Sequence, residues 1–208
     1  MYNKEFVHET LRIGDLNPLT FRVRPTTFFQ TNSYACEKLY SKVVDLCKEF
    51  VSDDEHLTIL DICCGTGTIG LAVGSSLPKS KVLGIDIVES AIQDAYENSV
   101  ENKITSTEYL VGDVRQYIDR LTNDIDGKCI AIVDPPRAGL HKNVRDHIIF
   151  CENIDRLIYI ACNPKTLEEC MPSLCSVFKP VSSYIVDLFP QTSQMEMIVC
   201  FDRIQKKE

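Results

Sequence analysis

The chain alternates short apolar runs with amphipathic segments over most of its length. From Leu57 onward, five strand-like runs (LTILDIC, KVLGID, TEYLVGD, KCIAIVD and RLIYIAC) are separated by segments whose apolar residues recur at helical spacing. This alternation predicts an α/β fold with a mostly parallel sheet covered by helices on both faces. Two last runs, VSSYIVDLF and EMIVCF, flank a short loop, so we expect a seven-stranded sheet with an antiparallel hairpin at its C-terminal edge.

Residues 1–50 follow a different pattern. Two alternating runs surround the turn-forming residues of 14–18, which predicts a β-hairpin. The stretch SYACEKLYSKVVDLCKEF then has one apolar helical face, which Thr31, Asn32 or Ser33 can cap. We expect this hairpin and helix to pack on a catalytic domain of residues 51–208 in one compact unit.

Composition narrows the class of protein. The 208 residues are 44% hydrophobic and 25% charged, which is typical of a globular domain. No run approaches the ~20 apolar residues of a membrane span, and the N-terminus lacks the apolar core of a signal peptide. We therefore expect a protein of the cytoplasm or nucleus, monomeric and without a membrane partner.

Cysteine usage and charge exclude two further classes. The ten cysteines are scattered without zinc spacing, which predicts reduced core thiols, no disulfide framework and no metal site. The net charge of −8 is unfavourable for nucleic-acid binding, which depends on cations that neutralise phosphates. A local basic patch remains compatible with that charge.

The stretch LDICCGTGTIG indicates a cofactor loop between a strand and a helix. Gly65 and Gly67 allow a tight turn and close approach of a ligand, although a plain strand-to-helix turn is the alternative. Asp86 ends the next strand, where an acid can bind ribose hydroxyls. Asp61, which we also expect to contact the cofactor, disfavours a pyrophosphate, so S-adenosylmethionine, with S-adenosylhomocysteine as product, is preferred to NAD. Asp113 can contact the adenine amine or cap a helix.

Two further strands carry chemistry at their ends. Asp134 and Cys162 follow neighbouring apolar runs, and each precedes rigid proline-containing sequence, Pro135-Pro136 and Asn163-Pro164. Ligands of open α/β sheets bind beyond the carboxyl ends of the strands, so both residues should flank the cofactor.

The DPP sequence alone suggests methylation of an exocyclic amine, but the cysteine favours carbon 5 of a pyrimidine. A thiolate that adds to carbon 6 makes carbon 5 nucleophilic. A base, expected on the opposite side, must then remove the carbon 5 proton before the thiolate can leave. Glu196 is the candidate base, and a surface acid on an edge strand is its alternative. For Cys162 the alternative is a buried structural thiol.

Six segments in order, FFQTN, LDICCGTGTIG, GIDIVESA, VDPPRAGLH, YIACNPKT and DLFPQTSQME, give the chain a resemblance to the RNA uracil-5-methyltransferases. The chain resembles most the eukaryotic tRNA branch, which makes ribothymidine in the T-loop. The resemblance covers essentially all residues and implies a Rossmann-like class I methyltransferase fold and a tRNA partner. It implies that Cys162 is the nucleophile and Glu196 the proton acceptor. It also implies four contacts to S-adenosylmethionine: Gln30, Cys63, Asp86 and Asp134.

Some positions depart from the family pattern. Ala161 stands where the family commonly has serine, Gln194 where it usually has histidine, and Cys63 where bacterial relatives have an aromatic residue. Family members also carry an RNA-binding region before the hairpin, so we expect the chain to be a catalytic fragment. For RNA contact near the site we expect Asp134, Arg137 and Asn163. Arg137 belongs to a small basic set with Lys142, Arg145 and Lys165, for which a solvated helix face is the alternative.

Two other functions remain open at this point. The Asp134 carboxylate could serve methylation of an exocyclic base amine with Cys162 as a spectator. The chain could also bind cofactor and RNA without catalysis.

Overall fold

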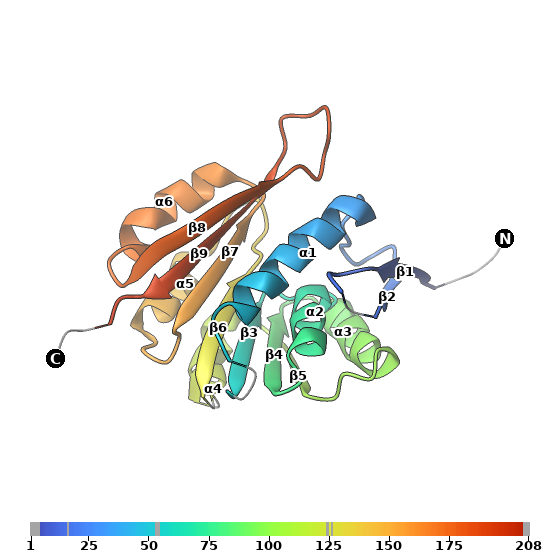
Figure 1. Cartoon of the computed structure of the whole chain (residues 1–208), viewed down its shortest axis with the longest axis horizontal. Coiled ribbons are helices and arrows are strands. Elements are labelled where there is room, and N and C mark those ends of the chain that lie inside the picture. The colour runs from blue at the N-terminus through green and yellow to red at the C-terminus, as the bar shows by residue number, and fades with distance from the viewer. Residues whose placement is uncertain (1–4, 16, 53–54, 124, 126, 206–208) are drawn as a thin grey trace.

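The computed structural model describes residues 5–15, 17–52, 55–123, 125 and 127–205. These residues form a small hairpin and a larger sheet flanked by helices (Figure 1). In chain order the elements are β1 (Val7–Leu11), β2 (Leu19–Val23), α1 (Ser33–Lys48), β3 (Leu57–Ile62), α2 (Thr68–Ser76), β4 (Ser80–Asp86), α3 (Glu89–Glu101), β5 (Thr107–Val111), α4 (Val114–Asn123), β6 (Lys128–Val133), α5 (Lys142–Phe150), β7 (Arg156–Ala161), α6 (Pro164–Leu174), β8 (Phe178–Val186) and β9 (Glu196–Arg203).

The larger sheet has seven strands in the order β5-β4-β3-β6-β7-β9-β8. The strands β3 to β7 pair in parallel, and β9 pairs antiparallel with both β7 and β8. The predicted fold class and antiparallel C-terminal hairpin are therefore confirmed. Within that hairpin, β8 is the edge strand, whereas β9 lies between two neighbours.

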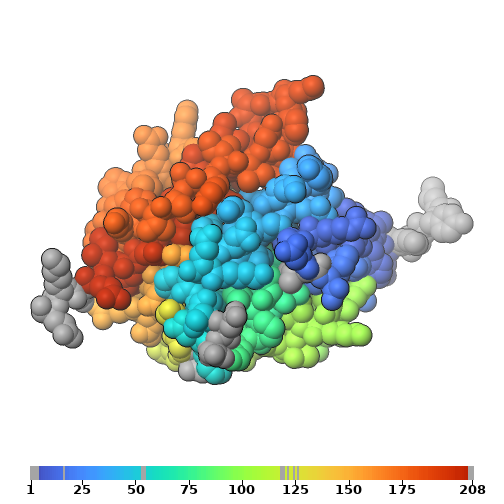
Figure 2. Space-filling model, in the orientation of Figure 1, coloured from blue at the N-terminus to red at the C-terminus, as the bar shows by residue number. Residues whose placement is uncertain are grey.

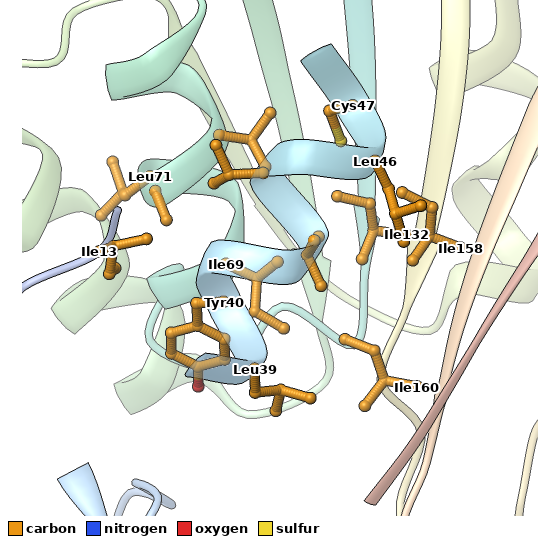
Figure 3. Packing of buried hydrophobic residues seen from close by; sticks show 14 of the residues in the cluster. Ile13, Leu39, Tyr40, Leu46, Cys47, Ile69, Leu71, Ile132, Ile158 and Ile160 are labelled. Atoms are coloured by element: carbon orange, nitrogen blue, oxygen red, sulfur yellow. The ribbon is translucent and has the colours of Figure 1, made fainter. Parts of the chain in front are cut away.

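Apolar residues alternate between the two faces of this sheet. Ile59, Ile132 and Ile158 face a core shared with α1, α2 and the hairpin, part of which Figure 3 shows. The residues next to them, such as Leu60 and Val133, face a second core shared with α4, α5 and α6. The sheet is thus buried on both faces, which explains why its strands read as continuous apolar runs.

Helix α1 lies between the hairpin and the β8–β9 pair (Figures 1 and 2). Of the three capping candidates, Asn32 is the N-cap, and its Oδ1 accepts from the backbone N–H of Ala35 at 3.1 Å. Among the described residues, no helix is long and apolar enough to cross a membrane.

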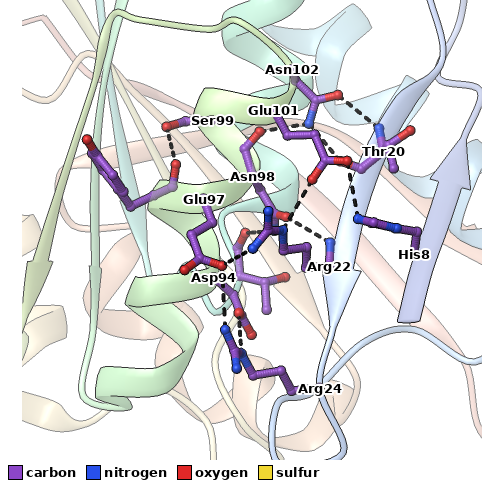
Figure 4. Close-up of polar contacts among 12 residues, drawn as sticks. His8, Thr20, Arg22, Arg24, Asp94, Glu97, Asn98, Ser99, Glu101 and Asn102 are labelled. Atoms are coloured by element: carbon purple, nitrogen blue, oxygen red, sulfur yellow. Dashed lines mark hydrogen bonds and ion pairs between the residues drawn. The ribbon is translucent and has the colours of Figure 1, made fainter. Parts of the chain in front are cut away.

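The predicted N-terminal hairpin is present and docks on α3 through a polar ladder (Figure 4). In this ladder, every fourth residue on one face of α3 pairs with every second residue of β2 and of the segment just after it. Asn102 exchanges two hydrogen bonds with the backbone of Thr20, at 2.9 and 2.7 Å. Asn98 accepts from the backbone N–H of Arg22 at 2.8 Å. Four helical residues advance about 6 Å and two strand residues about 6.6 Å, so the two spacings match.

Asn98 is fully buried and its amide also donates to the carbonyl of Thr66 at 3.0 Å. Replacing Asn98 with leucine leaves the Arg22 N–H and the Thr66 carbonyl without these partners. We expect the free energy of unfolding to fall by about 2–4 kcal/mol, since each unsatisfied buried group costs about 1–3 kcal/mol. Urea denaturation measures this change.

The exposed Gln93 on the same helix provides a matched control. Gln93→Leu should change the free energy of unfolding by no more than about 0.5 kcal/mol. Equal effects of the two leucine substitutions would contradict the role assigned to the buried amide.

Candidate active site

A cavity of about 710 Å³ lies at the carboxyl ends of the central strands. Its volume is in the range of small-molecule and cofactor sites. One end is formed by the loops after β3, β4 and β5, and the other by the ends of β6, β7 and β9. The predicted residues that line it are Gln30, Cys63, Gly65, Asp86, Asp113, Asp134, Arg137, Cys162 and Glu196.

The loop after β3 turns through left-handed backbone conformations. Gly65 and Gly67 have φ of 54° and 75°, and a Cβ on Gly67 would lie 2.9 Å from the hydroxyl oxygen of Tyr109. Cys63, which lines the cavity, also has a positive φ of 63°. Such a conformation is uncommon for a residue with a side chain and makes this loop a candidate for close contact with a ligand.

Acidic side chains follow β4 and β5. The two oxygens of Asp86 accept from the backbone N–H groups of Gly65 and Val88, each at 2.9 Å, so this carboxylate fixes both neighbouring loops. A carboxylate has about four lone-pair sites, which leaves capacity for ligand hydroxyls. Asp113 lines the cavity, is paired with Arg115, and accepts from the Arg115 backbone N–H at 3.0 Å. Asp113 therefore both caps the start of α4 and faces the cavity.

Asp61 lies beneath the loop and does not line the cavity. It is 0% exposed, and its Oδ2 accepts from the Gly70 N–H at 2.9 Å. Burial raises the pKa of Asp61 to about 7, and the nearby charge of Asp86 adds to this shift. The Asp61 carboxyl thus contacts the start of α2 and does not border the cavity.

The other end of the cavity brings together three predicted residues from neighbouring strands. Asp134 follows β6, Cys162 follows β7, and Glu196 begins β9. Each continues the alternation that places Ile132, Ile160 and Ile198 on the α1 side of the sheet.

The register of β7 and β9 pairs Ile160 with Ile198 and Ala161 with Met197. One further step places Cys162 opposite Glu196, where side chains of adjacent strands are neighbours. The two therefore lie side by side on one sheet face, and both line the same cavity. The expectation that the base faces the cysteine from the opposite side does not fit this register. Glu196 is also 4% exposed on an interior strand, so it is not the surface acid of an edge strand.

Burial raises the pKa values of Glu196, Asp134 and Cys162. It raises the pKa of Glu196 to about 7, against the lowering influence of Arg137. Burial, and then the charges of Glu196 and Asp61, raise the pKa of Asp134 to about 8. The pKa of Cys162 is likewise raised by burial and by the carboxylates of Glu196 and Asp134, whereas Arg137 lowers it. The site thus holds two carboxyls that titrate near neutrality beside a thiol.

The predicted substrate residues differ in position. Arg137 lines the cavity, whereas Asn163 does not. The Asn163 side chain instead accepts from the Lys165 N–H and donates to the Arg137 carbonyl, both at 3.3 Å, and so holds the rim in place. The remaining residues of the basic set, Lys142, Arg145 and Lys165, lie outside the cavity lining.

Reasoning from the residues alone missed part of the lining. Gln30 entered only through the family resemblance, yet it is 5% exposed, lines the cavity and makes no hydrogen bond among the described residues. Ile87, Val88 and Tyr40 were also missed. Ile87 and Val88 directly follow Asp86 at a strand end, so the sequence could have indicated that they line the cavity. Tyr40 gave no such indication, because in the sequence it only extends the apolar face of a helix.

The described residues contain no cluster of three or more side chains that could hold a metal ion. The lining instead suits an organic cation with an apolar part. Four carboxyl side chains border the cavity, beside apolar residues such as Ile87 and Val88. Glu196 Oε2 is buried without a hydrogen-bond partner among the described residues, which leaves it free to accept from a ligand.

Comparisons with known proteins agree with this arrangement. The family model described as tRNA (Uracil-5-)-methyltransferase matches residues 1–204. The chain is 40% identical over 203 residues to mouse tRNA (uracil-5-)-methyltransferase homolog A, covering 92% of this chain and 32% of that protein. It is 34% identical over 204 residues to a putative RNA methyltransferase of Acanthamoeba polyphaga mimivirus, covering 96% of this chain and 51% of that protein.

Among solved structures, the chain matches the Pyrococcus abyssi tRNA (uracil-54, C5)-methyltransferase in complex with S-adenosyl-L-homocysteine. The TM-score is 0.72 at 29% identity, with 96% of this chain and 45% of that chain covered. A SAM-dependent methyltransferase from Agrobacterium tumefaciens matches at 14% identity with a TM-score of 0.67, which supports the Rossmann-like fold alone. The chain spans about a third of the length of the mammalian homolog A proteins.

The charges around Cys162 predict how its reactivity responds to substitution. Glu196→Gln removes a neighbouring negative charge, so forming the thiolate costs less and the pKa of Cys162 should fall. The pH at which iodoacetamide alkylation of Cys162 reaches half its maximal rate should move to lower pH, as followed by peptide mass spectrometry. Arg137→Met should move it to higher pH, because this change removes a stabilising cation.

The exposed Cys175 is an internal control, and its alkylation profile should be the same in all three proteins. An unchanged profile for Cys162 in both variants would mean that its thiol does not sense these side chains.

Proposed function

The chain belongs to the tRNA (uracil-5-)-methyltransferase family, and from this premise we propose that it methylates carbon 5 of a uridine in the T-loop of tRNA. The observation that carries the proposal is the register that sets Cys162 beside Glu196 at the end of one cavity. S-adenosylmethionine would supply the electrophilic methyl group. We place this activity in the cytoplasm or nucleus, as expected for a relative of the eukaryotic homolog A proteins.

The residues at the glycine-loop end would hold the cofactor. Asp86 would accept from ribose hydroxyls, and Asp113 from the adenine amine, beside the apolar wall of Ile87 and Val88. Gln30 offers a free amide that can both donate and accept. Cys63 and Gly65 line the same end of the cavity in left-handed backbone conformations and would contact the cofactor there.

Cys162 first gives its thiol proton to water, and the resulting thiolate adds to carbon 6 of the uracil, so that the 5,6 double bond opens and carbon 5 becomes enolate-like. Carbon 5 then gains the methyl group while it still carries its proton. Glu196 removes that proton, the double bond re-forms, and the carbon–sulfur bond breaks to release Cys162. A carboxyl with a pKa near 7 is suited to this step, because it can accept a proton and return it at neutral pH.

From the position of Glu196 beside Cys162 we infer the stereochemistry of the reaction. The base can reach the carbon 5 proton only if that proton lies on the same ring face as the sulfur. The methyl group must therefore add to the other ring face. This geometry replaces the earlier expectation of a base across the ring, and it lets one sheet face serve both addition and elimination.

Asp134 supports a second candidate reaction, because its carboxyl lies beside the same pocket end and could bind an exocyclic amine. Its raised pKa of about 8 disfavours that role, since a protonated carboxyl keeps only part of its capacity to accept an amine hydrogen. In the main proposal a protonated Asp134 would donate to a uracil carbonyl. Mass spectrometry of digested RNA, which locates the methyl group on carbon 5 or on nitrogen, separates these reactions.

The two catalytic roles predict opposite behaviour of the covalent adduct. Cys162→Ala should abolish both methylation and the protein–RNA adduct, because no nucleophile remains. Glu196→Gln should lower turnover by about 10²–10⁴-fold, the usual contribution of a general base, and let the methylated adduct accumulate. Denaturing gels with labelled tRNA and mass spectrometry of the adduct measure both effects.

Cys175→Ala serves as the control, since this exposed cysteine lies outside the cavity lining and should leave methylation and adduct unchanged. Methylation by Cys162→Ala at the rate of the unsubstituted protein would disprove the nucleophile. An inactive Glu196→Gln protein that forms no adduct would remove the basis for assigning Glu196 to proton removal.

A further inference from the structure

The polar ladder of α3 continues past the hairpin to a buried ion pair. Asp94, one helical turn before Asn98, is 0% exposed, and its Oδ1 accepts a hydrogen bond from the Nε of Arg24 at 2.6 Å (Figure 4). Arg24 also lies 3.5 Å from Glu97. Arg24 provides the positive charge that compensates the buried carboxylate of Asp94. Losing this partner costs more free energy than losing an amide hydrogen bond of Asn98 or Asn102, because it leaves a buried charge unpaired.

Arg24 begins the segment that delivers Gln30 to the cavity. A turn fixes its start: the Thr27 N–H donates to the Arg24 carbonyl, and the Arg24 N–H to Thr27 Oγ1, both at 3.2 Å. The ring of Phe29 then packs 6.2 Å from that of Phe21, between centroids. At the far end, Asn32 donates to the carbonyl of Leu188 at 3.2 Å. Residues 24–32 are thus a strap that is anchored at both ends and lines the cavity in between.

The same helix also reaches two other walls of the cavity. Helix α3 starts directly after Ile87 and Val88, which line the cavity, and Val88 accepts the first helical hydrogen bonds. Asn98 reaches the glycine loop through its bond to the Thr66 carbonyl. Asp94 and Asn98, which are consecutive rungs of the ladder, therefore contact the strap and the glycine loop. The start of α3 carries the third wall of the cavity, Ile87 and Val88.

We propose that Asp94, through Arg24, is a positioning residue for the cofactor: the buried ion pair fixes the distance between the Gln30 strap and the walls carried by α3. The inference rests on the proposed function, because it assigns S-adenosylmethionine to this end of the cavity. Neither residue lines the cavity, so their effect on the ligand passes through the strap. A wall held in place before binding saves the cost of ordering it on binding.

The test uses S-adenosylhomocysteine binding measured by calorimetry. Arg24→Met should weaken the Kd by about tenfold, equal to about 1.4 kcal/mol of binding free energy. Arg24→Lys keeps a cation near Asp94 but lacks the planar fork, so it should fold and give an intermediate Kd. If Arg24→Met does not fold, the Kd of Arg24→Lys decides. At saturating cofactor, kcat for the lysine variant should stay near that of the unsubstituted protein while KM for S-adenosylmethionine rises.

Arg22, in β2 two residues before Arg24, offers a matched control. Its side chain pairs with Glu97 at 2.5 Å and with Glu101 at 3.3 Å, but it lies two residues further from the strap and is 29% exposed. Arg22→Met and Arg22→Lys should leave the Kd unchanged, even where they lower the melting temperature.

Equal Kd values for the Arg24 and Arg22 variants would overturn this inference while leaving the proposed function intact. Absence of S-adenosylhomocysteine binding by the unsubstituted protein would overturn both.

Discussion

The antiparallel pairing of β9 with β7 is the constraint on which the proposed chemistry depends. Its register sets Ala161 opposite Met197, and so brings the residues just beyond, Cys162 and Glu196, together at the strand ends. Side chains alternate along a strand, so a shift of one residue would turn Glu196 to the α4–α6 face of the sheet. The apolar residues that follow on β9, Ile198 and Cys200 toward α1 and Val199 and Phe201 toward the other face, hold this register by their burial.

Burial serves both stability and chemistry at this site. The two cores enclose the sheet and leave its carboxyl edge as a deep, mostly apolar cavity. In that setting the carboxyls of Glu196 and Asp134 titrate near neutral pH instead of near 4. Arg137 opposes this trend for both Glu196 and Cys162, and under the proposed function this cation would be available to an RNA phosphate. A chain with a net charge of −8 thus has a positive charge close to Cys162.

Much of the fold could be predicted from the sequence because its signals are local. Alternating strand and helix patterns indicated the parallel sheet. Turn residues indicated the N-terminal hairpin, and the short loop between two apolar runs indicated the C-terminal one. Strand-end positions placed Asp86, Asp134 and Cys162 at one edge. The side-by-side placement of Cys162 and Glu196 could not be predicted, because it depends on the order and register of strands far apart in the chain. Gln30 and the ladder of α3 likewise depend on a hairpin that docks on a helix about 75 residues later. The environment of Asp61 could not be predicted either. Its residue type and position suggested a ligand contact, but its side chain is buried beneath the loop and accepts from the Gly70 N–H.

The central claim is that Cys162 forms a covalent bond to carbon 6 of a uridine, and 5-fluorouridine-substituted tRNA tests it most directly. Fluorine cannot be removed as a proton, so the bond to sulfur should persist after the methyl group is transferred. Peptide mass spectrometry should then find one methylated fluorouridine on the peptide that contains Cys162. A conjugate on another cysteine, or methylation of ordinary tRNA by a protein that forms no conjugate with the fluorinated substrate, would contradict the account.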